Sequence, residues 1–245
     1  MKIAVTGQGV LAETTRKACK GTNIELCATS HKDIEILWIC HDTPLDERVS
    51  PAFADYEQVI NWIQQDISEL DGVPVILISS QLPVLTTFRL KERFPKHFFA
   101  YSPENIRVAS ADADFARQSR IVVGVPNASR NSQLENLLGR FTHSLIFTNP
   151  ETAEMVKHAL NCYLGMSIAF INEIAKVCER VKADVNVVSE ALLSERRISP
   201  NAPLKPGKPF GGGHLMRDIL AMEQFAKGRG LSLPIIQHIR ESNES

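Results

Sequence analysis

Several features that would assign a chain to a special class are missing from these 245 residues. No apolar run approaches the roughly 20 residues of a membrane-spanning helix, so we expect no membrane association. The 27 basic and 28 acidic side chains leave a net charge of −1, which argues against a nucleic-acid partner. The hydrophobic share of 44% is ordinary for a globular protein with a core.

Cysteine and histidine also lack a metal-binding or disulfide pattern. The five cysteines are scattered and form no Cys-x-x-Cys pair: Cys19, Cys27, Cys40, Cys162 and Cys178. Six histidines show no metal-ligand spacing: His31, His41, His97, His143, His158 and His238. We therefore predict no metal site, and surface or locally bonded histidines. A strand-like run begins at once over residues 1–5, so we expect no signal peptide and a cytoplasmic protein with reduced thiols.

The chain changes character near residue 148, which predicts two domains. Residues 1–147 alternate strand-like and helical patterns, as is typical of a parallel α/β sheet. The strand-like runs are 2–6, 24–29, 34–40, 73–79, 97–100 and 120–125. The helical patterns between them are 10–19, 56–70, 85–93 and 129–141.

Residues 148–245 predict an all-α domain. Thr148-Asn149-Pro150-Glu151 is a strong helix start, and no breaker follows until about Arg180 except Gly165. Thirty residues make a helix of about 45 Å. Its middle is apolar on more than one face, so we predict burial in a homodimer across residues 150–181. Further helices are expected over 185–193 and 215–227, with a loop over 199–213.

Gly7-Gln8-Gly9-Val10-Leu11-Ala12 stands between a predicted strand and a predicted helix. Gly7 permits a tight turn, Gly9 lets the backbone approach a pyrophosphate, and Ala12 lets the helix pack closely on the strand. The helix start at Val10 offers N–H groups to phosphates. The pattern predicts a nicotinamide dinucleotide site, and a Gly-rich turn that binds nothing is the alternative.

The second predicted strand lacks the acidic residue that holds the ribose hydroxyls of NAD. Its end is Thr29-Ser30-His31-Lys32, with Asp33 close by. Ser30 and its neighbours can instead accept the 2′-phosphate of NADP, or the position is idle.

Only about four residues join the 24–29 and 34–40 runs, whereas a parallel crossover needs a dozen or more. We therefore expect that the two runs are not both ordinary parallel strands. Either one is antiparallel or the 24–29 run is reorganised. In both cases the adenosine half of a Rossmann-like domain is shortened.

The middle of the chain resembles the UDP-glucose and GDP-mannose dehydrogenase family. The resemblance begins at Tyr101-Ser102-Pro103-Glu104-Asn105-Ile106-Arg107 and continues in Asp114-Phe115 and Arg120-Ile121-Val122-Val123-Gly124. Other matching segments include Glu151-Thr152-Ala153-Glu154-Met155-Val156-Lys157, Phe170-Ile171-Asn172-Glu173 and Pro206-Gly207-Lys208-Pro209-Phe210-Gly211-Gly212-Gly213. These matches run in order from residue 3 to about 243.

The resemblance implies a Rossmann-like domain over 1–147 and a long helix with a dimer-forming helical domain over 148–245. In the family a third, nucleotide-closing domain normally follows, and this sequence stops before it. The family oxidises nucleotide sugars twice with NAD, from alcohol to aldehyde to acid. A cysteine traps the aldehyde between the two steps.

The resemblance also implies roles for individual residues. Lys157 and Asn161, four apart on one helix face, match a lysine that stabilises an alkoxide and an asparagine that holds the sugar or a water. Asp218 matches an aspartate that orients a water, and Glu104 matches the first glutamate of the central motif. The alternatives are a chance pair, a helix cap and a turn carboxylate. Further cofactor and substrate contacts are expected at Thr43, Pro44, Arg197, Phe210, Gly211 and Gly212.

Departures from the family pattern limit the expected chemistry. His214 stands where the family has its catalytic cysteine, and an imidazole does not readily replace a thiolate as a nucleophile. Other family positions are changed at Gln81, Leu85, Val108 and Arg217. Two hypotheses follow. In the first, the chain is an NAD(P)-dependent oxidoreductase limited to one oxidation step, and His214 or Lys157 transfers the proton. In the second, it is a catalytically inactive relative that binds a ligand or partner.

Overall fold

The computed structural model describes residues 1–44, 54–104, 106, 110–116, 118–211 and 213–244. These residues form two compact units. The first comprises Met1–Pro44 and Asp55–Lys157, and the second includes His158–Ser245. The division falls inside one long helix, and each unit is described by itself below.

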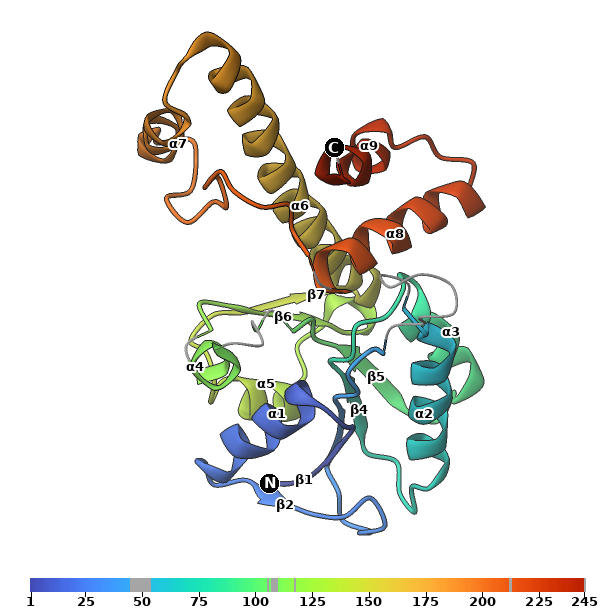
Figure 1. Cartoon of the computed structure of the whole chain (residues 1–245). Helices are drawn as coiled ribbons and strands as arrows, with labels where there is room; N and C mark the ends of the chain where they lie inside the picture. Colours follow the sequence, from blue (N-terminus) through green and yellow to red (C-terminus); the bar gives the residue numbers. More distant parts are fainter. Residues whose placement is uncertain (45–53, 105, 107–109, 117, 212, 245) are drawn as a thin grey trace. The chain divides into compact units, whose positions relative to one another are not determined.

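The first unit is built on a seven-stranded sheet with the order β2-β1-β3-β4-β5-β6-β7 (Figure 1). All neighbouring strands are parallel except β5 and β6, which are antiparallel and pair at Tyr101 and Gly124. The α/β prediction is thus confirmed, with one antiparallel junction that the sequence did not predict. The strands are β1 Lys2–Thr6, β2 Glu25–Leu26, β3 Ile36–Ile39, β4 Val75–Ile78, β5 Phe98–Tyr101, β6 Ile121–Gly124 and β7 Leu145–Thr148.

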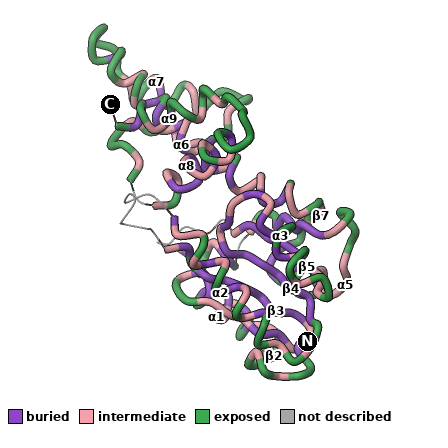
Figure 2. Tube along the Cα trace, turned by 90° about the vertical axis from the view of Figure 1, so that its right-hand side faces the viewer, coloured by how far each residue is buried: buried purple, intermediate pink, exposed green. Residues whose placement is uncertain are grey.

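Helices cover both faces of this sheet. On one face lie α1 Val10–Lys20, α4 Ala111–Ala116 and α5 Ser132–Leu138, and on the other lie α2 Tyr56–Ser68 and α3 Thr86–Arg93 (Figure 1). Successive residues of a strand therefore enter different cores: Trp38 packs against the first face and Leu37 against the second. The inner strands β3, β4 and β6 are buried along their length (Figure 2), which explains why they are apolar without alternation.

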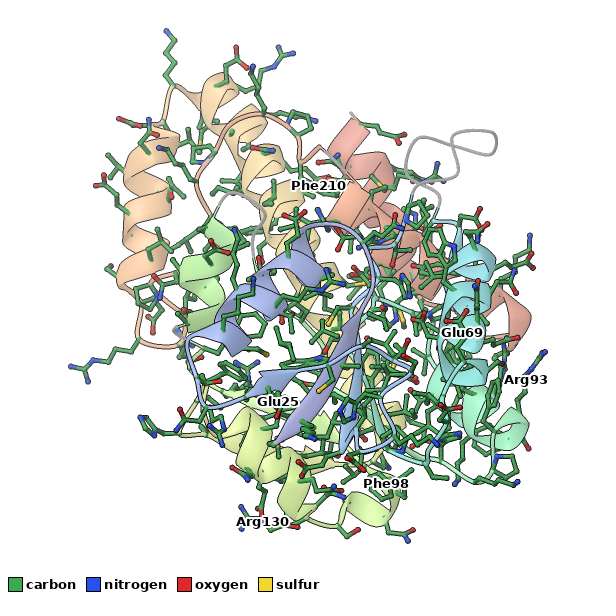
Figure 3. The ribbon with its side chains drawn as sticks, turned by 90° about the horizontal axis from the view of Figure 1, so that it is seen from below. Glu25, Glu69, Arg93, Phe98, Arg130 and Phe210 are labelled. Carbon is green, nitrogen blue, oxygen red and sulfur yellow. The ribbon has the colours of Figure 1, made fainter. Side chains whose placement is uncertain are left out.

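Of the two alternatives for the 24–29 and 34–40 runs, an antiparallel strand is wrong, and a reorganised 24–29 run is confirmed. β2 and β3 both pair in parallel with β1, on its opposite sides. The 24–29 run is nevertheless reorganised, because β2 keeps only Glu25 and Leu26 (Figure 3 labels Glu25). A two-residue strand rises only about 7 Å, so the connection has little distance to recover and needs no helix. β2 is the outermost strand among the described residues, so this side of the sheet is short.

The second unit is helical. The long helix α6 runs unbroken over Pro150–Val181, as predicted, and α7 Val185–Ser194, α8 Gly213–Gly228 and α9 Pro234–Glu244 follow. Only α9 had no counterpart in the prediction. The helix α6 continues through Gly165, where the missing side chain allows α8 to pack closely. A Cβ there would lie 2.9 Å from the Ile219 side chain of α8.

Within the first unit, the start of α6 is bound to α3 through a buried carboxylate. Glu154 is 1% exposed and accepts hydrogen bonds from the Leu85 N–H at 2.6 Å, the Thr87 N–H at 2.9 Å and the Thr87 hydroxyl at 2.7 Å. Burial raises the pKa of Glu154 against the effect of these bonds. Leu85 has a φ of 72°, a left-handed conformation that a side chain disfavours, so the carboxylate holds a strained helix start.

We predict that Glu154→Ala lowers the free energy of unfolding by about 3 kcal/mol, because two backbone N–H groups lose their acceptor in a buried place. Urea unfolding followed by circular dichroism measures the change. Glu179→Ala, an exposed position on the same helix, is the control and should change stability by less than about 0.5 kcal/mol. Equal stability of the two variants would contradict the capping role.

Candidate functional site

The glycine turn between β1 and α1 has the conformation that its sequence requires. Gly7 and Gly9 have φ values of 116° and 100°. A Cβ on Gly7 would lie 2.5 Å from the Cys40 carbonyl group, so only glycine fits there. Ala12 is fully buried on α1, and Arg16 donates to the carbonyl oxygens of Val5 and Gly7 at 3.0 and 2.9 Å. The turn is therefore tight and fixed from both sides.

Asp42 occupies the start of α1. It follows β3 and its Oδ2 accepts from the Val10 N–H at 2.8 Å, while its Oδ1 accepts from the Leu11 N–H at 3.3 Å. The N-cap residue Gly9 has no side chain to cap the helix, and a Cβ on it would lie 2.0 Å from Asp42 Oδ2. The N–H groups that would bind a phosphate thus bind a carboxylate of the same chain.

The first unit fits a dinucleotide in part. The glycine turn and the helix start suit a diphosphate, but Asp42 holds the anion position. Ser30 is exposed in the turn after β2, and the nearby Asp33 pairs with Lys2 at 3.6 Å. A bound diphosphate therefore requires the Asp42 side chain to move first. Sequence reasoning missed Asp42, although a charged residue at the end of a buried strand was a visible signal.

Thr43 and Pro44 join neighbouring loops at the carboxyl ends of the strands. The Thr43 hydroxyl donates to the Gln81 carbonyl oxygen at 2.8 Å, which links the loops after β3 and β4. The Pro44 carbonyl accepts from the Asp55 N–H at 3.0 Å, next to the start of α2. Both residues thus hold the loop that carries Asp42.

Glu104 and Lys157 are brought together in the first unit. The Lys157 ammonium donates to the backbone carbonyl of Glu104, and the Glu104 carboxylate accepts from the Ile106 N–H at 2.7 Å. Lys157 is partly buried, so its charge is placed by this contact rather than left to solvent. The Glu104 side chain forms the local turn, while its carbonyl positions the lysine.

In the second unit, Asp218 lies at the centre of a buried polar cluster. It is fully buried on α8, its Oδ1 lies 3.0 Å from His158 Nδ1, and its Oδ2 accepts from the Asn161 amide. Burial alone would raise the pKa of Asp218, but the bonds from His158 and Asn161 and the charge of Arg217 lower it. Asp218 therefore stays ionised, and it is not the cap of α8, which begins at Gly213.

His158 was predicted only to be surface-exposed or locally bonded, and its local partner is the Asp218 carboxylate. His158 is 2% exposed and Asn161 is 6% exposed. The signal that could have revealed the cluster is the three-residue spacing of His158 and Asn161, which places both on one face of α6.

His214 lies exposed in the first turn of α8, 3.4 Å from Arg217. A cysteine does reach the Asp218 environment, namely Cys162 on α6. Burial, with the Asp218 and Glu223 charges, raises the pKa of Cys162 to about 12, so it is a neutral thiol at physiological pH. Cys162 therefore supplies no thiolate near Asp218.

The expected substrate contacts are scattered along loops. Arg197 is exposed and pairs with Glu195 at 3.1 Å. The Phe210 backbone (labelled in Figure 3) exchanges two hydrogen bonds with the Asn243 side chain, at 2.9 and 3.1 Å, and Gly211 is exposed. Gly212 and Val108 lie outside the described residues. The loop is thus held at Phe210.

In the part of the chain that the structure describes, no three His, Cys, Asp or Glu side chains gather as metal ligands. Over the same residues, no helix combines the length and apolar character needed to cross a bilayer.

Comparison with known proteins gives the relationships of the chain. Residues 151–245 match the model of the UDP-glucose/GDP-mannose dehydrogenase family, central domain. UDP-glucose 6-dehydrogenase TuaD of Bacillus subtilis is 33% identical over 217 residues, which cover 86% of this chain and 46% of that protein. UDP-glucose 6-dehydrogenase of Rickettsia bellii is 30% identical over 87% of this chain and 50% of that protein. The chain thus spans about half the length of these curated relatives.

Solved structures show the same fold. A UDP-glucose dehydrogenase from Pyrobaculum islandicum superposes with a TM-score of 0.82 at 22% identity, covering 99% of this chain and 68% of that one. A UDP-D-ManNAc dehydrogenase from Pyrococcus horikoshii gives a TM-score of 0.79 at 19% identity, over 100% of this chain and 68% of that one. The order of strands and helices is therefore shared with these enzymes.

We predict that Asp218→Asn lowers the free energy of unfolding by on the order of 3 kcal/mol at pH 7, because it removes one partner of a buried pair. The pKa of Asp218 is lower in the folded protein than its ordinary 3.8, so the stabilisation is full above that value and is lost as the pH falls through the folded pKa. The difference between wild type and variant should therefore shrink in acid.

Urea unfolding at a series of pH values measures this difference, with the exposed Asp71→Asn as the control. A difference that stayed constant from neutral pH into acid would show that Asp218 is not a stabilising ion.

Proposed function

Because the chain belongs to the UDP-glucose/GDP-mannose dehydrogenase family, we propose that it is an NAD(P)-linked oxidoreductase of a nucleotide sugar or related polyol. We propose further that it performs one oxidation rather than two. The observation that carries the proposal is the Lys157 ammonium, which the Glu104 carbonyl holds in the first unit. The restriction to one oxidation rests on the sequence, where His214 stands at the family's cysteine position.

The chain's own residues can support one oxidation of an alcohol. When bound, a nicotinamide dinucleotide supplies the hydride acceptor. The Lys157 ammonium, held by the Glu104 carbonyl, stabilises the negative charge that develops on the substrate oxygen. The hydroxyl proton passes to a water as the C=O bond forms. One hydride and one proton leave, and the product is an aldehyde.

The second oxidation is not expected, because the aldehyde has no nucleophile to hold it. The imidazole of His214 is exposed and acts as a base rather than as a covalent trap. Cys162 remains protonated, since burial raises its pKa to about 12. An aldehyde that forms no thiohemiacetal leaves before a second hydride transfer.

A catalytically inactive relative that binds a ligand or partner is the second candidate. The observation that favours it is that both carboxylates near the expected chemistry are already engaged. Asp218 is fully buried and held on both oxygens by His158 and Asn161. Asp42 is bonded to the start of α1. A protein that uses these groups for structure has less left for catalysis.

The surface of α6 supports the proposal of a homodimer. Tyr163, Phe170 and Val177 are 49%, 47% and 58% exposed, respectively. They recur every seven residues, so they lie on one face of α6. An apolar stripe of this kind is normally covered, and a second copy of α6 offers a matching stripe.

We predict that the purified protein reduces NAD or NADP with a nucleotide sugar, yields aldehyde and yields no uronic acid. Trapping the aldehyde with a hydrazine and mass spectrometry measures the products. Lys157→Met should lower kcat by about 100-fold, since it removes the charge that stabilises the alkoxide. His214→Cys should not fully restore uronate formation, because Gln81 remains changed. Uronate from the unaltered protein would contradict the one-step proposal.

The same preparations separate the two candidates. Isothermal titration calorimetry with NAD, NADP and UDP-sugars should show cofactor binding if the chain is an oxidoreductase. If neither binding nor turnover is detected with any of these ligands at high protein concentration, the hypothesis of an inactive relative is favoured. Micromolar cofactor binding would count against it.

We predict that Phe170→Glu converts the dimer into a monomer, because it places a charge in the apolar stripe of α6. Sedimentation velocity measures the assembly state. Val187→Glu, which places the same charge at a 60% exposed position on α7, is the control and should leave the dimer intact. A monomeric unaltered protein would rule the dimer out.

A further inference from the structure

The start of α1 is occupied by an anion that the chain itself supplies. Asp42 accepts from the N–H groups of Val10 and Leu11, at 2.8 and 3.3 Å. These two donors belong to the first turn of the helix, where the partial positive charge of its dipole is largest. The carboxylate comes from 32 residues further along the chain, so it is not a local cap dictated by the helix sequence.

We propose that Asp42 sets the affinity of the glycine turn for diphosphate-bearing nucleotides by competing with the diphosphate for these N–H groups. The inference rests on the proposed function for the identity of the ligand. It goes beyond that function by naming the residue that decides how tightly the ligand binds.

The space around the turn supports direct competition. A Cβ on Gly9 would lie only 2.0 Å from Asp42 Oδ2, so the carboxylate fills the place that the missing side chain leaves open. In a dinucleotide site, that open place lets the diphosphate approach the backbone. A diphosphate and the Asp42 carboxylate therefore exclude each other by volume as well as by charge.

Asp42 is able to leave without unfolding the turn. Its side chain is exposed, and its backbone N–H is bonded separately to the Gln8 carbonyl at 3.1 Å. Arg16 holds the carbonyls of Val5 and Gly7 independently of Asp42. Rotation of the side chain into solvent thus frees both helix N–H groups while the loop keeps its place. A diphosphate that binds must first break the two hydrogen bonds between Asp42 and the helix, and this cost weakens its apparent affinity.

The test compares ligand binding by the full chain with and without the carboxylate. Asp42→Ala should bind NAD and ADP about 10- to 100-fold more tightly than the unaltered protein, as measured by isothermal titration calorimetry. Asp42→Asn keeps the shape and removes the charge, so it should show an intermediate gain. Adenosine, which has no phosphate, should bind all three proteins equally.

The matched control is Glu13→Gln. Glu13 is an exposed carboxylate in the first turn of the same helix, and its side chain is not the one bonded to Val10 or Leu11. The Glu13→Gln substitution removes the same unit of charge as Asp42→Asn, and it should change the affinity for NAD by about twofold or less. Thermal unfolding gives a second readout. Without ligand, Asp42→Ala should melt below the unaltered protein because α1 loses its cap, whereas saturating NAD should raise its Tm more.

The outcomes are distinct from those of the proposed function. Equal affinity of the unaltered protein and Asp42→Ala for NAD and ADP, or no binding by either while both remain folded, overturns the competition. An equal gain in Glu13→Gln also overturns it. If Asp42→Ala gains affinity but no variant turns over a nucleotide sugar, the competition holds and the oxidoreductase fails. If the protein turns over a nucleotide sugar but Asp42→Ala leaves the affinity for NAD and ADP unchanged, the oxidoreductase holds and the competition fails.

Discussion

The unbroken length of α6 is the constraint on which most of the structure depends. Its 32 residues place a different contact on each successive turn. Glu154 holds α3, Lys157 meets Glu104, and Asn161 meets Asp218. Gly165 then lets α8 approach. These contacts keep their spacing because the 3.6-residue period of the helix continues through Gly165 without a break.

Two carboxylate side chains of the protein accept hydrogen bonds from helix N–H groups that would otherwise bind water or a ligand. Glu154 binds the N–H groups at the start of α3, and Asp42 binds those at the start of α1. Both use the same physics, since unsatisfied N–H groups and the helix dipole attract an anion. The difference is burial. Glu154 is enclosed and structural, whereas Asp42 is exposed and can be exchanged for another anion.

This difference bears on the two candidate functions. An oxidoreductase of this family needs the start of α1 for its cofactor, while an inactive relative can use Asp42 permanently as a cap. Asp218 raises the same question in the second unit, because a buried carboxylate that pairs with His158 and accepts a hydrogen bond from Asn161 is a poor base. In the first unit, Lys157 remains as a charged group that its contact with Glu104 places.

The local features of the fold could be predicted from the sequence. Alternating apolar runs and helical periodicity revealed most strands and helices, and Thr148-Asn149-Pro150-Glu151 marked the start of α6 closely. The helix α9 was not predicted. The short elements β7 and α4 were not predicted either, and β2 was predicted too long. Such elements are maintained by packing against neighbours rather than by their own periodicity.

The candidate site divides in the same way. By itself the sequence determined the tight glycine turn and the long helix, because each depends on neighbours a few residues apart. Only the tertiary structure decided that Asp42 occupies α1 and that His158 and Asn161 enclose Asp218. Those contacts join residues 31 to 60 positions apart, from the pair of Leu11 and Asp42 to the pair of His158 and Asp218. Chain folding, and no local pattern, brings them together.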